Sequence, residues 1–174
     1  MVELNFAIED SAPVRDAAAP AIGFRLRVAE PAARPTPVHS IALRCQVRIQ
    51  PARRRYSVPE QERLLDLFGT PDRWGKTVRD LPWAAVNVTV PPFAGATTVE
   101  LCVPSDRDPT RAATRYFEAL DGGEAALVFL FSGRMTYEAA GLVPQVGFIP
   151  WDREARYRLP VALWKDLFAE AVSP

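Results

Sequence analysis

The chain of 174 residues is long enough for one domain with a sizeable core, and its 21 basic residues balance 21 acidic ones. Zero net charge argues against nucleic acid or an acidic lipid surface as the main partner, because both favour basic proteins. The sequence shows no signal peptide, no apolar run near the roughly 20 residues of a membrane span, and only two cysteines. We therefore expect a single globular domain over residues 1–174, located in the cytoplasm and not associated with a membrane.

Alternating apolar and polar residues predict three strands early in the chain, over residues 2–8, 22–28 and 41–49. Residues 10–20, which are rich in Ala, Pro and Asp, are typical of a loop, and several prolines precede the third strand. Because no helix lies between these strands, we expect them to pair in antiparallel fashion.

A helix is predicted after the third strand. Ser57 and Glu60 stand at capping-box spacing, so each side chain can satisfy a free backbone N–H group, and Gly69 suits the end of the helix. The following segment, up to residue 82, is broken by proline and glycine and is expected to be irregular. Two further strands are predicted over residues 83–90 and 97–103.

The uncharged run Ala125–Phe131 marks the expected centre of the core, because a short apolar run of this kind is typical of a strand buried on both faces. The strand that contains it is predicted over residues 125–137. A helix that starts at Asp108-Pro109 precedes it, and a strand at 145–149 and a helix opened by Pro160 follow. These elements predict an α+β domain, with a mostly antiparallel twisted sheet or open sandwich covered by about three helices.

Catalytic or metal-binding machinery is not evident in the sequence. One histidine and two cysteines give none of the spacings of a zinc site, and we expect Cys45 and Cys102 to be buried, unreactive thiols. Ser132 lacks the Gly-x-Ser-x-Gly turn of a nucleophile, and no glycine-rich phosphate loop is present. We therefore expect no cofactor and no metal, and the sequence favours a binding protein over an enzyme.

Arginine is the most informative polar residue type, because its guanidinium suits bidentate recognition of carboxylate or phosphate groups. Two arginines share the outer face of the second predicted strand, and two share that of the third. If these strands pair, four guanidiniums line one sheet face and three more lie at its rim: Arg25, Arg27, Arg44, Arg48, Arg53, Arg54 and Arg55. Such a face would bind an anionic ligand or an acidic partner protein; the alternative is an ordinary solvated surface with scattered ion pairs.

The segment Pro150–Arg158 mixes Trp, Tyr and Arg without regular periodicity. This composition is typical of a binding hot spot, with Trp151, Arg153 and Arg156 as the candidate residues. It is equally typical of a loop anchored by a buried tryptophan. We favour the anchored loop, with Trp151 in the core and the charged residues outside.

Several stretches together resemble a family of uncharacterised actinobacterial proteins, over about residues 2–170: Ala42-Leu43-Arg44-Cys45-Gln46-Val47-Arg48-Ile49-Gln50-Pro51, Leu65-Asp66-Leu67-Phe68-Gly69 with Arg73-Trp74-Gly75, Ala113-Thr114-Arg115-Tyr116-Phe117-Glu118-Ala119-Leu120, Phe129-Leu130-Phe131-Ser132-Gly133, and Pro150-Trp151 through Tyr157-Arg158-Leu159-Pro160. Members of that family accompany [NiFe]-hydrogenase structural and maturation genes. The resemblance therefore implies an accessory or assembly role, with a hydrogenase subunit or maturation factor as the partner, and it implies no catalytic residues. Ser105 replaces a cysteine of the family pattern, which argues further against a cysteine–metal site.

The sequence leaves three functions open. The leading hypothesis is a non-catalytic accessory protein that assists assembly or maturation of a metalloenzyme, such as [NiFe]-hydrogenase, through protein–protein contacts. The second is a small-molecule binder or enzyme that acts on an anionic ligand through the arginine-lined face. The third is a structural module that self-associates through an uncovered sheet edge or the C-terminal helix.

Overall fold

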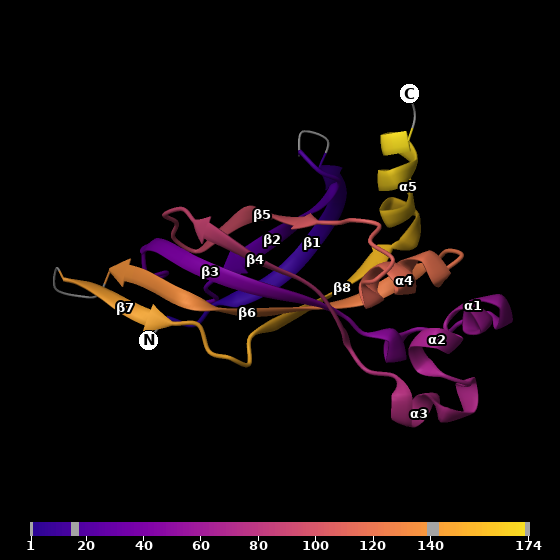
Figure 1. Cartoon of the computed structure of the whole chain (residues 1–174). Coiled ribbons are helices and arrows are strands. Elements are labelled where there is room, and N and C mark those ends of the chain that lie inside the picture. The colour runs from indigo at the N-terminus through magenta and orange to yellow at the C-terminus, as the bar shows by residue number, and fades with distance from the viewer. Residues whose placement is uncertain (1, 15–17, 139–142, 173–174) are drawn as a thin grey trace.

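Two antiparallel β-sheets pack face to face in the computed structural model, and the helices gather at one end of them (Figure 1). The structure describes residues 2–14, 18–138 and 143–172. The first sheet has the order β1-β2-β5, and the second has the order β4-β3-β6-β7, with β8 also paired to β6. The strands are β1 (Asn5–Val14), β2 (Ala21–Ala29), β3 (Val38–Ile49), β4 (Leu81–Val90), β5 (Ala96–Pro104), β6 (Glu124–Glu138), β7 (Pro144–Phe148) and β8 (Glu154–Pro160). This architecture confirms the predicted α+β fold with mostly antiparallel sheets.

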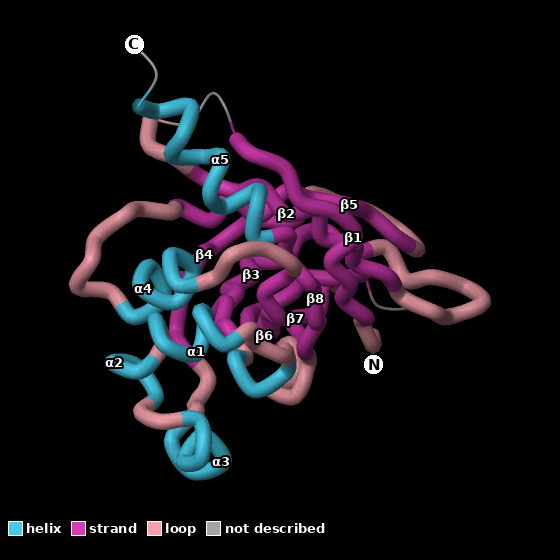
Figure 2. The backbone as a smooth tube through the Cα atoms, turned by 90° about the vertical axis from the view of Figure 1, so that its right-hand side faces the viewer, coloured by secondary structure: helices cyan, strands magenta, loops and turns pink. Residues whose placement is uncertain are grey.

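The helices are short, and Figure 2 shows them beside the end of the sheets that faces the viewer. They are η1 (Pro51–Arg53), α1 (Val58–Arg63), α2 (Leu65–Phe68), η2 (Pro71–Arg73), α3 (Trp74–Thr77), α4 (Ala112–Ala119) and α5 (Val161–Val172). The predicted capping box of α1 is present, with the Ser57 N–H donating to Glu60 Oε1 at 2.8 Å and the Glu60 N–H donating to Ser57 Oγ at 3.3 Å. The helix α4 begins later than predicted, because Asp108 accepts hydrogen bonds from Thr110 and forms a turn instead of a helix cap.

The first sheet contains a longer β1 than the sequence pattern predicts. A bulge between Ile8 and Asp10 shifts the register, and the strand then continues to Val14 instead of ending in a loop. Pro13 is tolerated there because β1 is an edge strand of its sheet, where a missing N–H group costs no ladder hydrogen bond. Of the predicted loop, residues 15–17 lie outside the described residues.

The second sheet is built on β3 and β6, which pair along most of their length. Cys45 of β3 lies between Val86 of β4 and Phe131 of β6. The other edge of β6 is shared, because β7 pairs with its last part and β8 with its first part. The strand β8 was not predicted: its residues up to 158 are expected from the sequence to be an irregular loop, and Pro160, which ends the strand, is expected to open a helix.

The central strand β6 confirms the prediction made for Ala125–Phe131. All of these residues are buried except Leu130, which is half-buried. Phe129 and Phe131 point to the first sheet, where Phe24 and Phe6 meet them at ring-centroid distances of 5.1 and 4.4 Å. Ala126 and Val128 are buried on the opposite face of the strand, so this part of β6 is covered on both sides.

The two sheets approach one another at their edges. The strand β1 runs beside β8, and the hydroxyl groups of Ser11 and Tyr157 share a hydrogen bond of 2.7 Å there. The strand β4 runs beside β5 in the same way. At the helical end, Phe117 of α4 contacts Trp83 of β4 and stacks on Trp164 of α5, so the two longest helices close the core. Within the described ranges, no helix is long and apolar enough to cross a membrane.

Candidate functional site

The arginines singled out from the sequence lie on two separate surfaces. Their grouping assumed that the second and third strands pair, but β2 belongs to the first sheet and β3 to the second. Arg25 and Arg27 therefore face outward from one layer, and Arg44 and Arg48 face outward from the other. The predicted face of four guanidiniums is wrong, because β2 uses both of its edges to pair with β1 and β5.

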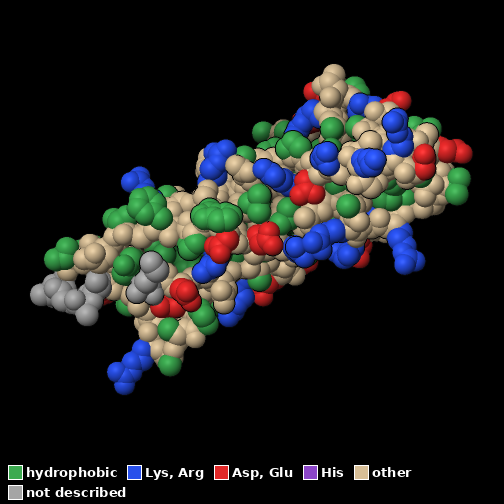
Figure 3. Space-filling model, turned by 90° about the horizontal axis from the view of Figure 1, so that it is seen from below, with side chains coloured by type: hydrophobic (Ala, Val, Ile, Leu, Met, Phe, Trp, Pro, Cys, Tyr) green, Lys and Arg blue, Asp and Glu red, His purple; other side chains and the backbone are tan. Residues whose placement is uncertain are grey.

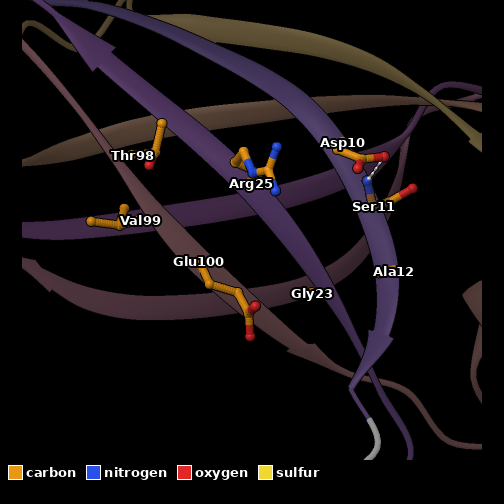
Figure 4. Close-up of a pocket in the computed structure, with 8 residues that line it drawn as sticks. All are labelled: Asp10, Ser11, Ala12, Gly23, Arg25, Thr98, Val99 and Glu100. Atoms are coloured by element: carbon orange, nitrogen blue, oxygen red, sulfur yellow. Dashed lines mark hydrogen bonds between the residues drawn. The ribbon is translucent and has the colours of Figure 1, made fainter.

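The outer face of the first sheet is mixed in charge. Arg25 of β2 lies between Asp10 of β1 and Glu100 of β5, its direct cross-strand partners, and Figure 4 shows the three side chains around one hollow. The hollow has a volume of about 250 Å³ and lies over Gly23, where a Cβ atom would come within 3.0 Å of the Glu100 carboxyl carbon. The carboxylates of Asp10 and Glu100 thus flank the Arg25 guanidinium. The hollow has no excess of positive charge that would attract an anion.

The outer face of the second sheet is strongly basic. Cross-strand pairing brings Arg44 opposite Ser132, and it brings Arg48 and Arg156 to either side of Val128. Over residues 42–48 of β3, 126–134 of β6 and 154–158 of β8, the outward positions carry one carboxylate, Glu154, and five arginines: Arg44, Arg48, Arg134, Arg156 and Arg158. Sequence reasoning missed Arg134 and Arg158 as members of this face, since their strands had no assigned partners.

Large hydrophobic side chains are exposed next to these arginines. Val146 is 60 %, Phe148 71 % and Trp151 90 % exposed, whereas the sequence had favoured Trp151 in the core. Arg134 is the cross-strand partner of Phe148, so the ring lies on the basic face. We call the surface formed by Arg44, Arg134, Val146, Phe148 and Trp151 the β7 patch. Figure 3 shows hydrophobic side chains toward the β7 end of the molecule and more Lys and Arg side chains toward the helical end.

The exposure of Trp151 has a local cause. The chain is fixed before the loop by buried Ile149, whose N–H donates to the Gly133 carbonyl at 2.9 Å. It is fixed again after the loop by the Arg153 carbonyl, which accepts from the Phe131 N–H at 3.1 Å. The residues between these two attachments to β6 have no room in the sheet, so Trp151 projects into solvent. Arg153 itself is only partly exposed and has an ion pair of 3.4 Å with Asp152.

A second feature of the basic face is a hollow at its helical end, with a volume of about 330 Å³. Its wall consists of Gln50, which follows β3, Arg53 from η1, and Arg156 and Arg158 from β8, and Ala126 of β6 lies in its floor. We call this feature the arginine hollow. It shares no residue with the β7 patch.

Arg54 is a structural residue and does not belong to the rim. Its side chain is 11 % exposed and forms a 2.7 Å ion pair with Glu60, while Nη1 donates to the Gly122 and Glu124 carbonyls. Burial opposes ionisation of Glu60, but the N–H groups of Ser57 and Asp121 and the Arg54 guanidinium outweigh it, so the pKa of Glu60 is lowered. This network ties the chain before α1 to the start of β6.

Two tyrosines extend the same network. The hydroxyl groups of Tyr56 and Tyr116 lie 2.5 Å apart, and that of Tyr56 also donates to the Pro51 carbonyl at 2.6 Å. Burial raises the pKa of both hydroxyls, that of Tyr116 to about 12, so both stay protonated at neutral pH. The contacts are those of a structural anchor, because Tyr116 has no exposed surface.

The two cysteines and Ser132, the candidate nucleophiles, have no activating partner among the described residues. Cys45 is buried as expected, and burial raises the pKa of its thiol to about 12. Cys102 is exposed on the outer face of the first sheet, contrary to prediction, because it lies opposite Gly23, which has no side chain to cover it. Ser132 is an exposed residue in the middle of β6. Among the described residues, no group of three or more His, Cys, Asp or Glu side chains could hold a metal.

The chain matches a protein family over nearly all of its length. It belongs to the family of unknown function DUF6084, which it matches over residues 1–173. Comparison with curated proteins and with solved structures finds no match. The expectation of an uncharacterised family is thereby confirmed, and the site has to be interpreted from its own chemistry.

Proposed function

We propose that this member of the DUF6084 family is a non-catalytic accessory protein that binds an acidic protein partner through the β7 patch. One observation carries the proposal: Phe148 is 71 % exposed directly beside Arg134, and Trp151, three residues further along, is 90 % exposed. The strands of this face carry five outward arginines against three outward carboxylates, those of Glu124, Glu138 and Glu154. Tryptophan and arginine, with other aromatic residues, are the types that dominate binding energy at protein interfaces.

The basic surroundings indicate the charge of the partner. Guanidiniums at Arg44 and Arg134 would pair with carboxylates at the rim of an interface, which raises the association rate and disfavours basic partners. The rings of Phe148 and Trp151 would supply the buried centre. Neither ring packs in the core of the unbound protein, so both are available to a partner.

The identity of the partner is a proposal of a different kind, because it rests on the family resemblance. The similarity to actinobacterial proteins that accompany [NiFe]-hydrogenase genes makes a hydrogenase subunit or maturation factor the first partner to test. An assembly role of this type requires only contact with a folding intermediate or a subunit, and it requires no catalytic group on this chain.

Affinity purification of the tagged protein from its native host, followed by mass spectrometry, tests the proposal. The wild type should retain an acidic partner that the Phe148→Ala/Trp151→Ala variant loses. The Arg25→Ala/Arg27→Ala variant is the control, because it truncates two exposed side chains of the opposite sheet and should retain the partner.

Three outcomes count against the proposal. Recovery of the wild-type protein alone would contradict partner binding, and equal recovery by all variants would place the interface elsewhere. A concentration-dependent dimer in light scattering that Phe148→Ala abolishes would show that the β7 patch binds a second copy of this chain.

A further inference from the structure

We infer that the arginine hollow binds a compact dianionic oxyanion, such as the phosphate group of a small metabolite. This inference goes beyond the proposed function and does not depend on it, because the arginine hollow and the β7 patch lie at opposite ends of one sheet face.

The arginines of the hollow come from separate parts of the chain. Arg53 belongs to η1 and Arg158 to β8, 105 residues further on, and Arg158 Nη2 lies 3.4 Å from the Arg53 carbonyl oxygen. This contact holds the Arg158 guanidinium against the segment that carries Arg53. Both residues also line the hollow, so the fold places two like charges at one site, which is unfavourable unless an anion or solvent screens them.

The charges of the hollow are poorly balanced by the protein. Arg156 Nη2 lies 3.7 Å from Glu154 Oε1, so this arginine has an acidic partner. Among the described residues, neither Arg53 nor Arg158 has a carboxylate within ion-pair distance. Two guanidiniums thus remain without an acidic partner, and the planar fork of an arginine side chain suits two oxygens of one phosphate group.

The floor of the hollow gives it depth. Ala126 of β6 is 96 % buried and too small to fill the space between β8 and η1. Gln50 lines the same hollow, and its Oε1 atom is buried without a hydrogen-bond partner. That atom is buried too deeply to contact a bound anion, so Gln50 contributes only to the wall of the hollow.

Isothermal titration calorimetry with inorganic phosphate and with pyrophosphate, at low ionic strength, tests the inference. Wild-type protein should bind at one site, and Arg53→Gln and Arg158→Gln should each weaken binding at least tenfold. Arg25→Gln, which removes an equally exposed arginine from the mixed-charge face, should leave the affinity unchanged. Arg158→Lys keeps the charge without the fork and should fall between the wild type and Arg158→Gln.

The results distinguish specific binding in the arginine hollow from non-specific electrostatic attraction to a basic surface. Equal weakening by Arg25→Gln and Arg158→Gln, or no measurable binding by the wild type, would overturn the inference. Equal binding of succinate and phosphate would overturn the assignment to a phosphate group. Circular dichroism of each variant checks that it is folded. Retention of the protein partner by Arg158→Gln would show that the arginine hollow and the β7 patch act separately.

Discussion

Arg134 of β6 and Phe148 of β7 are direct cross-strand partners, and both side chains face solvent. The guanidinium and the ring therefore occupy adjacent positions on a surface that contributes nothing to the core. Such a pair can be changed without affecting folding, which makes the surface accessible to mutation.

The Phe148→Ala/Trp151→Ala variant should be as stable as the wild type. Exposed side chains away from special contacts change the free energy of unfolding by no more than about 0.5 kcal/mol. Loss of partner affinity should exceed about 2 kcal/mol if these rings are the hot spot of the interface. Urea unfolding and a binding titration measure the two quantities, and a large loss of stability would contradict the exposure of Trp151.

Replacement of Glu60 by alanine should be among the most damaging single changes. It leaves the buried Arg54 guanidinium without its partner, and removal of one member of a buried pair costs about 3–5 kcal/mol. Glu62→Ala, on the exposed side of the same helix, is the matched control and should change the free energy of unfolding by less than about 0.5 kcal/mol. Similar losses in the two variants would argue against the network.

The same carboxylate predicts a dependence of stability on pH. The pKa of Glu60 is lowered in the folded protein, so its contribution is fully present above the ordinary value of 4.5 and is lost as the pH falls below it. Thermal unfolding between pH 6 and pH 3 should therefore show a steeper decline for the wild type than for Glu60→Gln. If the stability of the two proteins declines equally with falling pH, other carboxylates account for the loss of stability in acid.

The two thiols should differ in reactivity. Cys102 is exposed, whereas Cys45 is buried with a pKa raised to about 12, so only Cys102 should react with a thiol reagent in the native protein at pH 8. Mass spectrometry should show one label per chain in buffer and two in denaturant. Labelling of Cys45 before unfolding would indicate that the core of the second sheet opens readily.

Gly133 is required by the geometry of β6. Its φ angle is 141°, and a Cβ atom would overlap the carbonyl oxygen of Ala42 on β3. Gly133→Ala should therefore cost about 3 kcal/mol or more, because the clash is with the backbone and the conformation is strained. Gly75→Ala adds a Cβ atom in open space and should be nearly neutral, so equal effects in urea unfolding would contradict the explanation.

Local patterns in the sequence predicted many of the elements but few of their partners. Alternation along β3 and the apolar run in β6 were sufficient for both strands, because each pattern arises from burial of that strand alone. The placement of β2 and β3 in different sheets depends on contacts with distant strands. No local signal distinguishes that arrangement from direct pairing, and the grouping of Arg25 with Arg44 failed for this reason.

The candidate site was harder to predict than the fold. The composition around Trp151 left a binding hot spot and an anchored loop open, and the buried tryptophan that was favoured is wrong. The exposure of Trp151 is set by hydrogen bonds from Ile149 to Gly133 and from Phe131 to Arg153, which no sequence pattern reveals. Arg158 had the alternation of a strand around it, between buried Leu159 and half-buried Tyr157. A test of period-2 alternation over residues 154–160 could have identified β8, whereas the arginine hollow depends on its pairing with β6 and on the position of η1.

The sharing of β6 by β7 and β8 has a consequence for the order of events during synthesis. The strand β3 leaves the ribosome long before β6, and the β7 patch can form only after Pro144–Phe148 have paired with a β6 already joined to β3. The exposed rings thus take their positions only after β3 and β6 are in place. Under the proposed function, a partner that recognises them would distinguish chains with a formed second sheet from nascent ones.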